Sequence, residues 1–167
     1  EAGWSVELTD VWSGRSHTVQ TRSIVNAAGP WVAKFLGESM HRNGDKDVHL
    51  VKGSHIVVPK MFDHEDSYLF QNNDGRVIFA IPYEQDFTLI GTTDVAYEGN
   101  PADAEASAEE IQYLCDALNR YFKKSIGPDD VVWTYSGVRA LYDESDEDDV
   151  SAVSRDYSLD LDDSAAP

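Results

Sequence analysis

Residues 68–91 read YLFQNNDGRVIFAIPYEQDFTLIG, and this stretch decides the fold class. Two apolar runs, 68–71 and 76–83, flank Asn72-Asn73-Asp74-Gly75, which is a strong signal for a hairpin turn. A second short turn leads into a third apolar run at 87–91. Three strands joined by tight turns predict an antiparallel sheet.

The segments around this stretch extend the same fold. Strands are predicted at 48–58 and 131–141, and a helix at 107–124 carries apolar side chains at helical spacing on one face. Ser107 and Glu110 form a capping box at the start of this helix. The order of strands, helix and strands predicts an α+β fold, in which one long amphipathic helix packs on an antiparallel or mixed sheet.

The two ends of the chain add smaller elements. Residues 4–8 and 17–25 are predicted strands joined by a turn. Pro30 is expected to start a short helix that closes at Gly37, and 155–161 to form a last strand.

Charge and cysteine content restrict the function classes. The net charge of the 167 residues is −18, and residues 141–167 contribute half of it with ten acids and one base. Such a surface repels phosphate backbones, so we expect no nucleic-acid partner. Cys115 is the single cysteine, which excludes an internal disulfide and fits a reducing, cytoplasmic compartment. The acidic run 143–149 lacks the glycine and the final glutamate of an EF-hand loop, which favours a solvated loop over a metal site.

Three short polar segments interrupt apolar strands: Lys52-Gly53-Ser54-His55, Gly91-Thr92-Thr93-Asp94 and Tyr135-Ser136-Gly137-Val138-Arg139. Gly53 allows a bulge or a close backbone approach that aims His55 at a ligand. Pattern alone still favours structural roles for each segment, as capped strand ends and surface charges.

Asn26-Ala27-Ala28-Gly29 is different, because four small residues at a strand-to-helix junction expose backbone for contact with a flat or anionic group. Neither G-x-G-x-x-G nor the P-loop pattern occurs in the chain. Composition and spacing therefore indicate an α+β domain with an anion site, and no reaction.

Five motifs in order nevertheless resemble the FAD-dependent, quinone-linked glycerol-3-phosphate dehydrogenases. Together with Val25-Asn26-Ala27-Ala28-Gly29-Pro30-Trp31, they are Val51-Lys52-Gly53-Ser54-His55-Ile56-Val57-Val58-Pro59, Phe79-Ala80-Ile81-Pro82-Tyr83, Ile90-Gly91-Thr92-Thr93-Asp94, Val132-Trp133-Thr134-Tyr135-Ser136-Gly137-Val138-Arg139 and Arg155-Asp156-Tyr157. The resemblance runs from about Arg22 to about Asp160. Where the family has Arg-Pro-Leu, this chain has Arg139-Ala140-Leu141, a change that should leave the arginine in place.

The resemblance implies that the chain is an internal piece of a larger parent enzyme. Residues 1–46 would be a remnant of its FAD-binding domain, 47–150 its substrate-binding cap, and 151–167 a return segment. The parent would oxidise sn-glycerol 3-phosphate to dihydroxyacetone phosphate, pass a hydride to FAD and deliver electrons to quinone at the inner face of the cell membrane. The piece alone is expected to lack FAD and activity, because the glycine fingerprint is missing.

The resemblance also implies roles for particular residues. The implied catalytic residues are His55 and Arg139. The implied substrate-binding residues are Asp94, Lys52 and Arg155, and the residues implied to lie beside FAD are Ala27, Ala28 and Gly29. Histidine titrates near neutral pH and suits the role of base, while an arginine fork suits phosphate or a developing alkoxide. Which of His55 and Arg139 manages the proton stays open at this point.

Two other functions remain as alternatives. One is a relative of the amino-acid oxidases that acts on a small amine, and the other is a non-catalytic domain whose acidic run 143–149 binds a basic protein or a cation. Strands that lack partners in a truncated chain also predict dimerisation through their exposed edges.

Overall fold

The structure is a computed structural model that describes residues 3–39 and 48–142. These residues divide into two compact units, 3–28 and 29–142, with the boundary after Ala28. The elements of the first unit are β1 (Trp4–Thr9) and β2 (Ser16–Thr21). Those of the second are η1 (Gly29–Trp31), α1 (Val32–Lys34), η2 (Phe35–Ser39), β3 (Val48–Pro59), β4 (Tyr68–Gln71), β5 (Val77–Tyr83), β6 (Phe87–Gly91), β7 (Val95–Ala96), η3 (Pro101–Asp103), α2 (Ala108–Asn119), η4 (Pro128–Asp130) and β8 (Trp133–Tyr142).

In the first unit, β1 and β2 form an antiparallel hairpin in which Trp4 lies opposite Thr21. The Asp10 amide donates to the Arg15 carbonyl across the turn, and Gly14 takes the positive φ of +66° that the turn requires. The predicted hairpin is confirmed, but its second strand ends at Thr21 and not at Val25.

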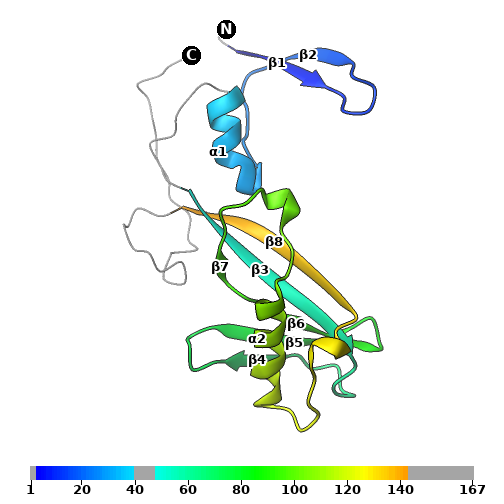
Figure 1. The fold of residues 1–167 in the computed structure, drawn as a ribbon. Helices are drawn as coiled ribbons and strands as arrows, with labels where there is room; N and C mark the ends of the chain where they lie inside the picture. The colour runs from blue at the N-terminus through cyan, green and yellow to red at the C-terminus, as the bar shows by residue number, and fades with distance from the viewer. Residues whose placement is uncertain (1–2, 40–47, 143–167) are drawn as a thin grey trace. The chain divides into compact units, whose positions relative to one another are not determined.

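The second unit is built on an antiparallel sheet with β3 at its centre (Figure 1). One edge of β3 pairs with β6 and then β7, and the other edge pairs with β8 along ten positions, from Val48↔Tyr142 to Val57↔Trp133. β5 and β4 continue the sheet beyond β6. Within the described residues every strand pairing is antiparallel, so the chain shows the antiparallel form of the predicted sheet.

The β4–β5 hairpin follows the turn signal in the sequence. The Asn72 amide donates to the Arg76 carbonyl, the Gly75 amide donates to the Asn72 carbonyl, and Gly75 adopts a φ of +81°. A residue with a Cβ would be strained at that angle, which is why glycine stands there. The hairpin that the sequence predicted at 68–83 is therefore confirmed.

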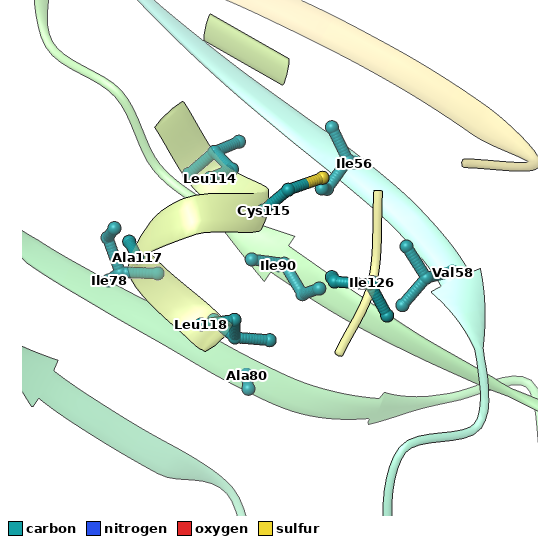
Figure 2. Close-up of a cluster of buried hydrophobic side chains, with 10 residues drawn as sticks. All are labelled: Ile56, Val58, Ile78, Ala80, Ile90, Leu114, Cys115, Ala117, Leu118 and Ile126. Atoms are coloured by element: carbon teal, nitrogen blue, oxygen red, sulfur yellow. The ribbon is translucent and has the colours of Figure 1, made fainter. Parts of the chain in front are cut away.

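One face of the sheet carries the hydrophobic core, which α2 covers (Figure 2). Alternate strand residues point to this face, and apolar residues of α2 meet them at helical spacing. The buried cluster comprises Ile56, Val58, Ile78, Ala80, Ile90, Leu114, Cys115, Ala117, Leu118 and Ile126. Each fully buried large aliphatic side chain stabilises the fold by roughly 1.5–3 kcal/mol relative to exposure.

The helix that covers the sheet is shorter than the sequence predicted. α2 starts as expected, with the Ser107 hydroxyl accepting from the Glu110 amide and the Glu110 carboxylate accepting from the Ser107 amide. It ends at Asn119 and not at Lys124, because the Asn119 side chain binds both the amide and the carbonyl of Ile126 and turns the chain back. The long helix of the prediction is therefore wrong by its last turn.

The short helical segment after Gly29 also differs from its prediction, since it continues through η2 to Ser39 and does not close at Gly37. The predicted strand at 155–161 and the acidic run at 143–149 lie outside the described residues.

Candidate functional site

The two faces of β3 have different surroundings. Residues with even numbers, such as Ser54 and Ile56, point to the face that α2 covers, and residues with odd numbers, such as Gly53 and His55, point to the opposite face. We call that opposite face the open face: Val51 and Val57 are buried on it, but Phe79 is 40% exposed and Tyr135 is 38% exposed. The candidate site lies on the open face.

His55 lies in a cross-strand row between Gly91 of β6 and Tyr135 of β8. Its ring stacks on the Tyr135 ring with a centroid distance of 4.7 Å and an interplanar angle of 3°. On the other side the ring covers Gly91, where a Cβ would collide with its Cδ2 atom. The absence of a side chain at Gly91 is therefore what admits the imidazole.

The environment of His55 favours the neutral imidazole. Burial is the larger cause that holds its pKa below the ordinary 6.5, and the positive charge of Arg139 is the second. The Nδ1 atom is buried and has no hydrogen-bond partner among the described residues. A neutral ring can accept a proton, which is the chemical property that a general base needs.

Arg139 reaches toward His55 because Gly53 lies between them on the same face. A Cβ on Gly53 would lie 3.3 Å from the Arg139 Nη2 atom and 2.6 Å from the Thr92 Oγ1 atom, so the bare backbone of Gly53 makes room for both. The Arg139 side chain is 41% exposed, and its Nη2 atom lies 3.5 Å from the Asp94 Oδ1 atom. Arg139 therefore presents a positive charge to the open face beside a neutral base.

Asp94 is aimed at Arg139 by a bulge between β6 and β7. His55 pairs with Gly91 and Lys52 with Val95, so three steps along β3 (55 minus 52) face four steps on the partner (95 minus 91). The extra residue lies within 92–94 and is a feature typical of sites where a side chain is re-aimed. The structure thus brings together the three polar segments that the sequence analysis singled out, although it places the bulge opposite Gly53 and not at it.

Lys52 is not brought together with His55 and Arg139. It points to the covered face, where its ammonium lies 2.8 Å from the Glu110 carboxylate and donates to the Glu105 carbonyl. Arg155 lies outside the described residues.

Sequence reasoning missed the contact of Tyr135 with His55, which depends on strand register. It saw Glu110 only as a helix cap, yet this carboxylate also binds Ser54, Thr93 and Lys52 across the sheet. The odd spacing of Lys52 and His55 along a strand was the one available signal that the two lie on opposite faces.

The predicted cofactor-contacting residues lie in the chain where one unit ends and the next begins. The Ala28 amide donates to the Asn26 side-chain oxygen, and Ala27 is exposed. Gly29 has a φ of +54°, and a Cβ there would meet no atom within 4 Å. Ala27 and Gly29 are small and exposed, which fits the close approach of a flat cofactor.

In residues 3–39 and 48–142, no group of three or more His, Cys, Asp or Glu side chains is placed to hold a metal ion. None of the helices in those same ranges has the length and apolar character to cross a bilayer.

Comparison with known proteins matches this chain to a family model, to two relatives and to a solved structure. The sequence model of a family described as FAD dependent oxidoreductase (DAO) matches residues 2–157. The aerobic glycerol-3-phosphate dehydrogenase of Escherichia coli (strain K12) is 45% identical over 96% of this chain, and the D-erythritol 1-phosphate dehydrogenase of Brucella abortus (strain 2308) is 49% identical over the same share. This chain spans 32% of the length of each of these relatives.

A solved structure is also similar: the glycerol-3-phosphate dehydrogenase from Bacillus halodurans complexed with FAD. It matches with a TM-score of 0.74 and 35% identity, over 84% of this chain and 28% of that one.

Proposed function

The chain belongs to the family of FAD-dependent oxidoreductases, and on that premise we propose that its parent enzyme oxidises sn-glycerol 3-phosphate to dihydroxyacetone phosphate. The observation that carries the proposal is the open face itself, where a neutral His55 lies beside the Arg139–Asp94 pair. The names of the relatives from Escherichia coli and Pseudomonas aeruginosa, at 45% and 43% identity, support the substrate. The parent enzyme is here the full-length protein that includes these residues.

We propose that His55 accepts the proton of the C2 hydroxyl group. Because Nδ1 is buried, Nε2 is the ring nitrogen assigned to this role. The Tyr135 stack and the bare Gly91 backbone fix the plane of the ring, so that the nitrogen is oriented before substrate arrives. Arginine is always protonated, so Arg139 cannot act as the base.

Arg139 is proposed to bind the substrate anion. Its guanidinium offers paired donors to phosphate or to a developing alkoxide, and Asp94 holds it in place from the side. Lys52 is left out of the proposed substrate contacts because its ammonium already binds Glu110 on the other face. Arg155 stays a prediction.

FAD supplies the hydride acceptor when it is bound. Ala27, Ala28 and Gly29 are proposed to lie against it, since their small side chains leave room for a flat group. The chain has no G-x-G-x-x-G, so the pyrophosphate would be held by other residues of the parent enzyme. Within this scheme 47–150 is the substrate-binding domain and α2 supports its sheet.

We propose that the parent enzyme passes its electrons on to quinone at the cytoplasmic face of the cell membrane.

Dimerisation through strand edges is proposed as well, because no described strand pairs with the outer edge of β4 or of β8. Light scattering of the 167-residue chain at rising concentration tests dimerisation, and a mass that stays that of the monomer would contradict it.

D-Erythritol 1-phosphate is a second candidate substrate, favoured by the 49% identity to the Brucella abortus enzyme. Both substrates are polyol phosphates, so the same base and the same cation would serve. Amine oxidation is less favoured, because the relatives named above are dehydrogenases of polyol phosphates.

The test is turnover by the purified parent enzyme with an artificial acceptor and each of the two polyol phosphates. His55→Ala and Arg139→Ala are expected to keep the flavin and to lose most of their turnover, and the activity that remains in Arg139→Ala should show a raised KM for the phosphate. If the wild-type enzyme oxidises neither compound, the proposed substrate class is refuted.

A further inference from the structure

Glu110 is a buried carboxylate that the proposed chemistry does not use. It is 6% exposed, and its Oε1 atom accepts from the Ser54 hydroxyl at 2.8 Å and from the Thr93 hydroxyl at 2.7 Å. Its Oε2 atom accepts from the Ser107 amide at 2.9 Å and contacts the Lys52 ammonium at 2.8 Å. A helix cap needs only the Ser107 contact.

The three other contacts tie the start of α2 to the sheet: Ser54 and Lys52 belong to β3, and Thr93 belongs to the bulge. The Thr93 hydroxyl donates to Glu110 and also accepts from the Ser54 amide at 2.9 Å. The Ser54 amide points to the bulged edge of β3 and donates there to a side-chain oxygen, that of Thr93. In a regular antiparallel ladder this amide would donate to a backbone carbonyl. Thr93 is therefore held from two sides, by the Glu110 carboxylate and by the Ser54 backbone, whose carbonyl also accepts from the Thr93 amide at 3.4 Å.

The residues on both sides of Thr93 face the candidate site. Thr92 lies against the bare backbone of Gly53, and Asp94 lies 3.5 Å from the guanidinium of Arg139. Any shift of Thr93 toward or away from α2 moves these two residues in the same backbone segment. The covered face and the open face are coupled at this point.

We propose that Glu110 is a positioning residue for Arg139, which acts by holding Thr93 and, through it, Asp94. The role is to keep the Arg139 guanidinium aligned beside Asp94, where it binds the substrate anion. Its effect on catalysis rests on the proposed function.

The ionic state of Glu110 agrees with this geometry. Burial opposes the charged form, but the Lys52, Ser107, Thr93 and Ser54 hydrogen bonds outweigh it, so the pKa of Glu110 lies below the ordinary 4.5. A glutamine has the same shape but only one acceptor oxygen. The Lys52 ammonium and the Ser107 amide can only donate, so the oxygen is expected to face them and the NH2 group to face the two hydroxyls. The Thr93 hydroxyl then loses its carboxylate acceptor. Glu110→Gln therefore loosens Thr93 while it leaves the packing volume unchanged.

The experiment measures kcat/KM of the parent enzyme with glycerol 3-phosphate, with flavin absorbance and the thermal unfolding midpoint as checks on the fold. Glu110→Gln is expected to lower kcat/KM by about 10- to 100-fold, because a displacement of about 1 Å at a substrate-positioning group has effects of that size. Glu109→Gln is the matched control: it makes the same chemical change one position earlier, on the exposed side of α2, and is expected to leave kcat/KM unchanged.

A double-mutant cycle separates positioning from general stability. If Glu110 acts through Arg139, Glu110→Gln has little further effect on kcat/KM in an Arg139→Gln background. If the full loss persists in that background, the proposal is refuted. Should Glu110→Gln fail to fold, Thr93→Val replaces it, and Thr93→Ser, which keeps the hydroxyl, is expected to restore most of the activity.

Failure of the proposed function gives a different result. A wild-type enzyme that oxidises neither polyol phosphate refutes the substrate class, and crystal structures of the wild-type enzyme and Glu110→Gln then decide the positioning role. An Arg139 guanidinium that keeps its place beside Asp94 in the variant refutes it, and a displaced guanidinium supports it.

Discussion

Replacing Gly91 by alanine is expected to displace the His55 ring and to remove most of the activity of the parent enzyme. A Cβ on Gly91 would lie 2.6 Å from Cγ and 2.7 Å from Nε2 of His55, and nearer still to Cδ2. Ordinary contacts of such atoms begin at 3.4 Å, so Cγ must withdraw by 0.8 Å (3.4 minus 2.6) and Cδ2 by more. The backbone cannot yield easily, because β6 is paired with β5 and β3 on its two edges.

The size of the effect follows from that displacement. A misplacement of about 1 Å at a catalytic group costs about 100-fold in rate, and the added methyl group costs about 1–3 kcal/mol in the free energy of unfolding. The assay is kcat/KM with glycerol 3-phosphate and an artificial acceptor, together with flavin absorbance and thermal unfolding.

Gly127→Ala is the matched control for this variant. Gly127 precedes η4, outside the candidate site, has an ordinary φ of −130°, and a Cβ there would meet no atom within 4 Å. We expect Gly127→Ala to keep activity within about two-fold, because the added methyl group meets neither the His55 ring nor any other atom. If Gly91→Ala also keeps activity within about two-fold while it binds flavin, the proposed role of the His55 ring is refuted.

Three further predictions concern charge and stacking. The acid limb of the kcat/KM pH profile should have an apparent pKa below 6.5, because burial and the Arg139 charge disfavour protonated His55. Arg139→Gln should move the pKa of this limb toward 6.5. An unchanged pKa would exclude electrostatic coupling between the two residues. Ionised Glu110 should stabilise the fold above pH 4.5 and lose this contribution as pH falls through its lower folded-state pKa. Below pH 4.5 the denaturant midpoint of Glu110→Gln should therefore depend less on pH than the midpoint of the wild type. Parallel curves of midpoint against pH for the two proteins would argue against this. Tyr135→Leu should lower kcat/KM by about 2- to 10-fold, from the 0.5–1.5 kcal/mol of a ring pair, whereas Tyr135→Phe keeps the stack and should match the wild type.

The elements that were predictable from sequence depend on local chemistry. The β4–β5 hairpin follows from Asn72-Asn73-Asp74-Gly75, and the start of α2 follows from the Ser107 capping box. The polar segments at His55, Asp94 and Arg139 were also identifiable, because each interrupts an apolar run.

The parts that the sequence did not reveal depend on contacts between distant segments. The last turn of the predicted helix is lost because Asn119 binds Ile126, and propensity alone contains no trace of that bond. The register that stacks Tyr135 on His55 and the reach of Glu110 to Thr93 both arise only when the sheet is assembled.

The pairing of β3 with β8 also limits how early the domain can fold during its synthesis. Tyr135 follows His55 by 80 positions (135 minus 55), so the outer edge of β3 has no β8 partner until the ribosome has released most of this domain. Contacts of such long range slow folding and leave an unpaired edge open to aggregation in the meantime. The strand that holds the proposed base is thus the one whose ladder is completed last, and a nascent chain stalled before residue 133 would hold His55 without the ring that orients it.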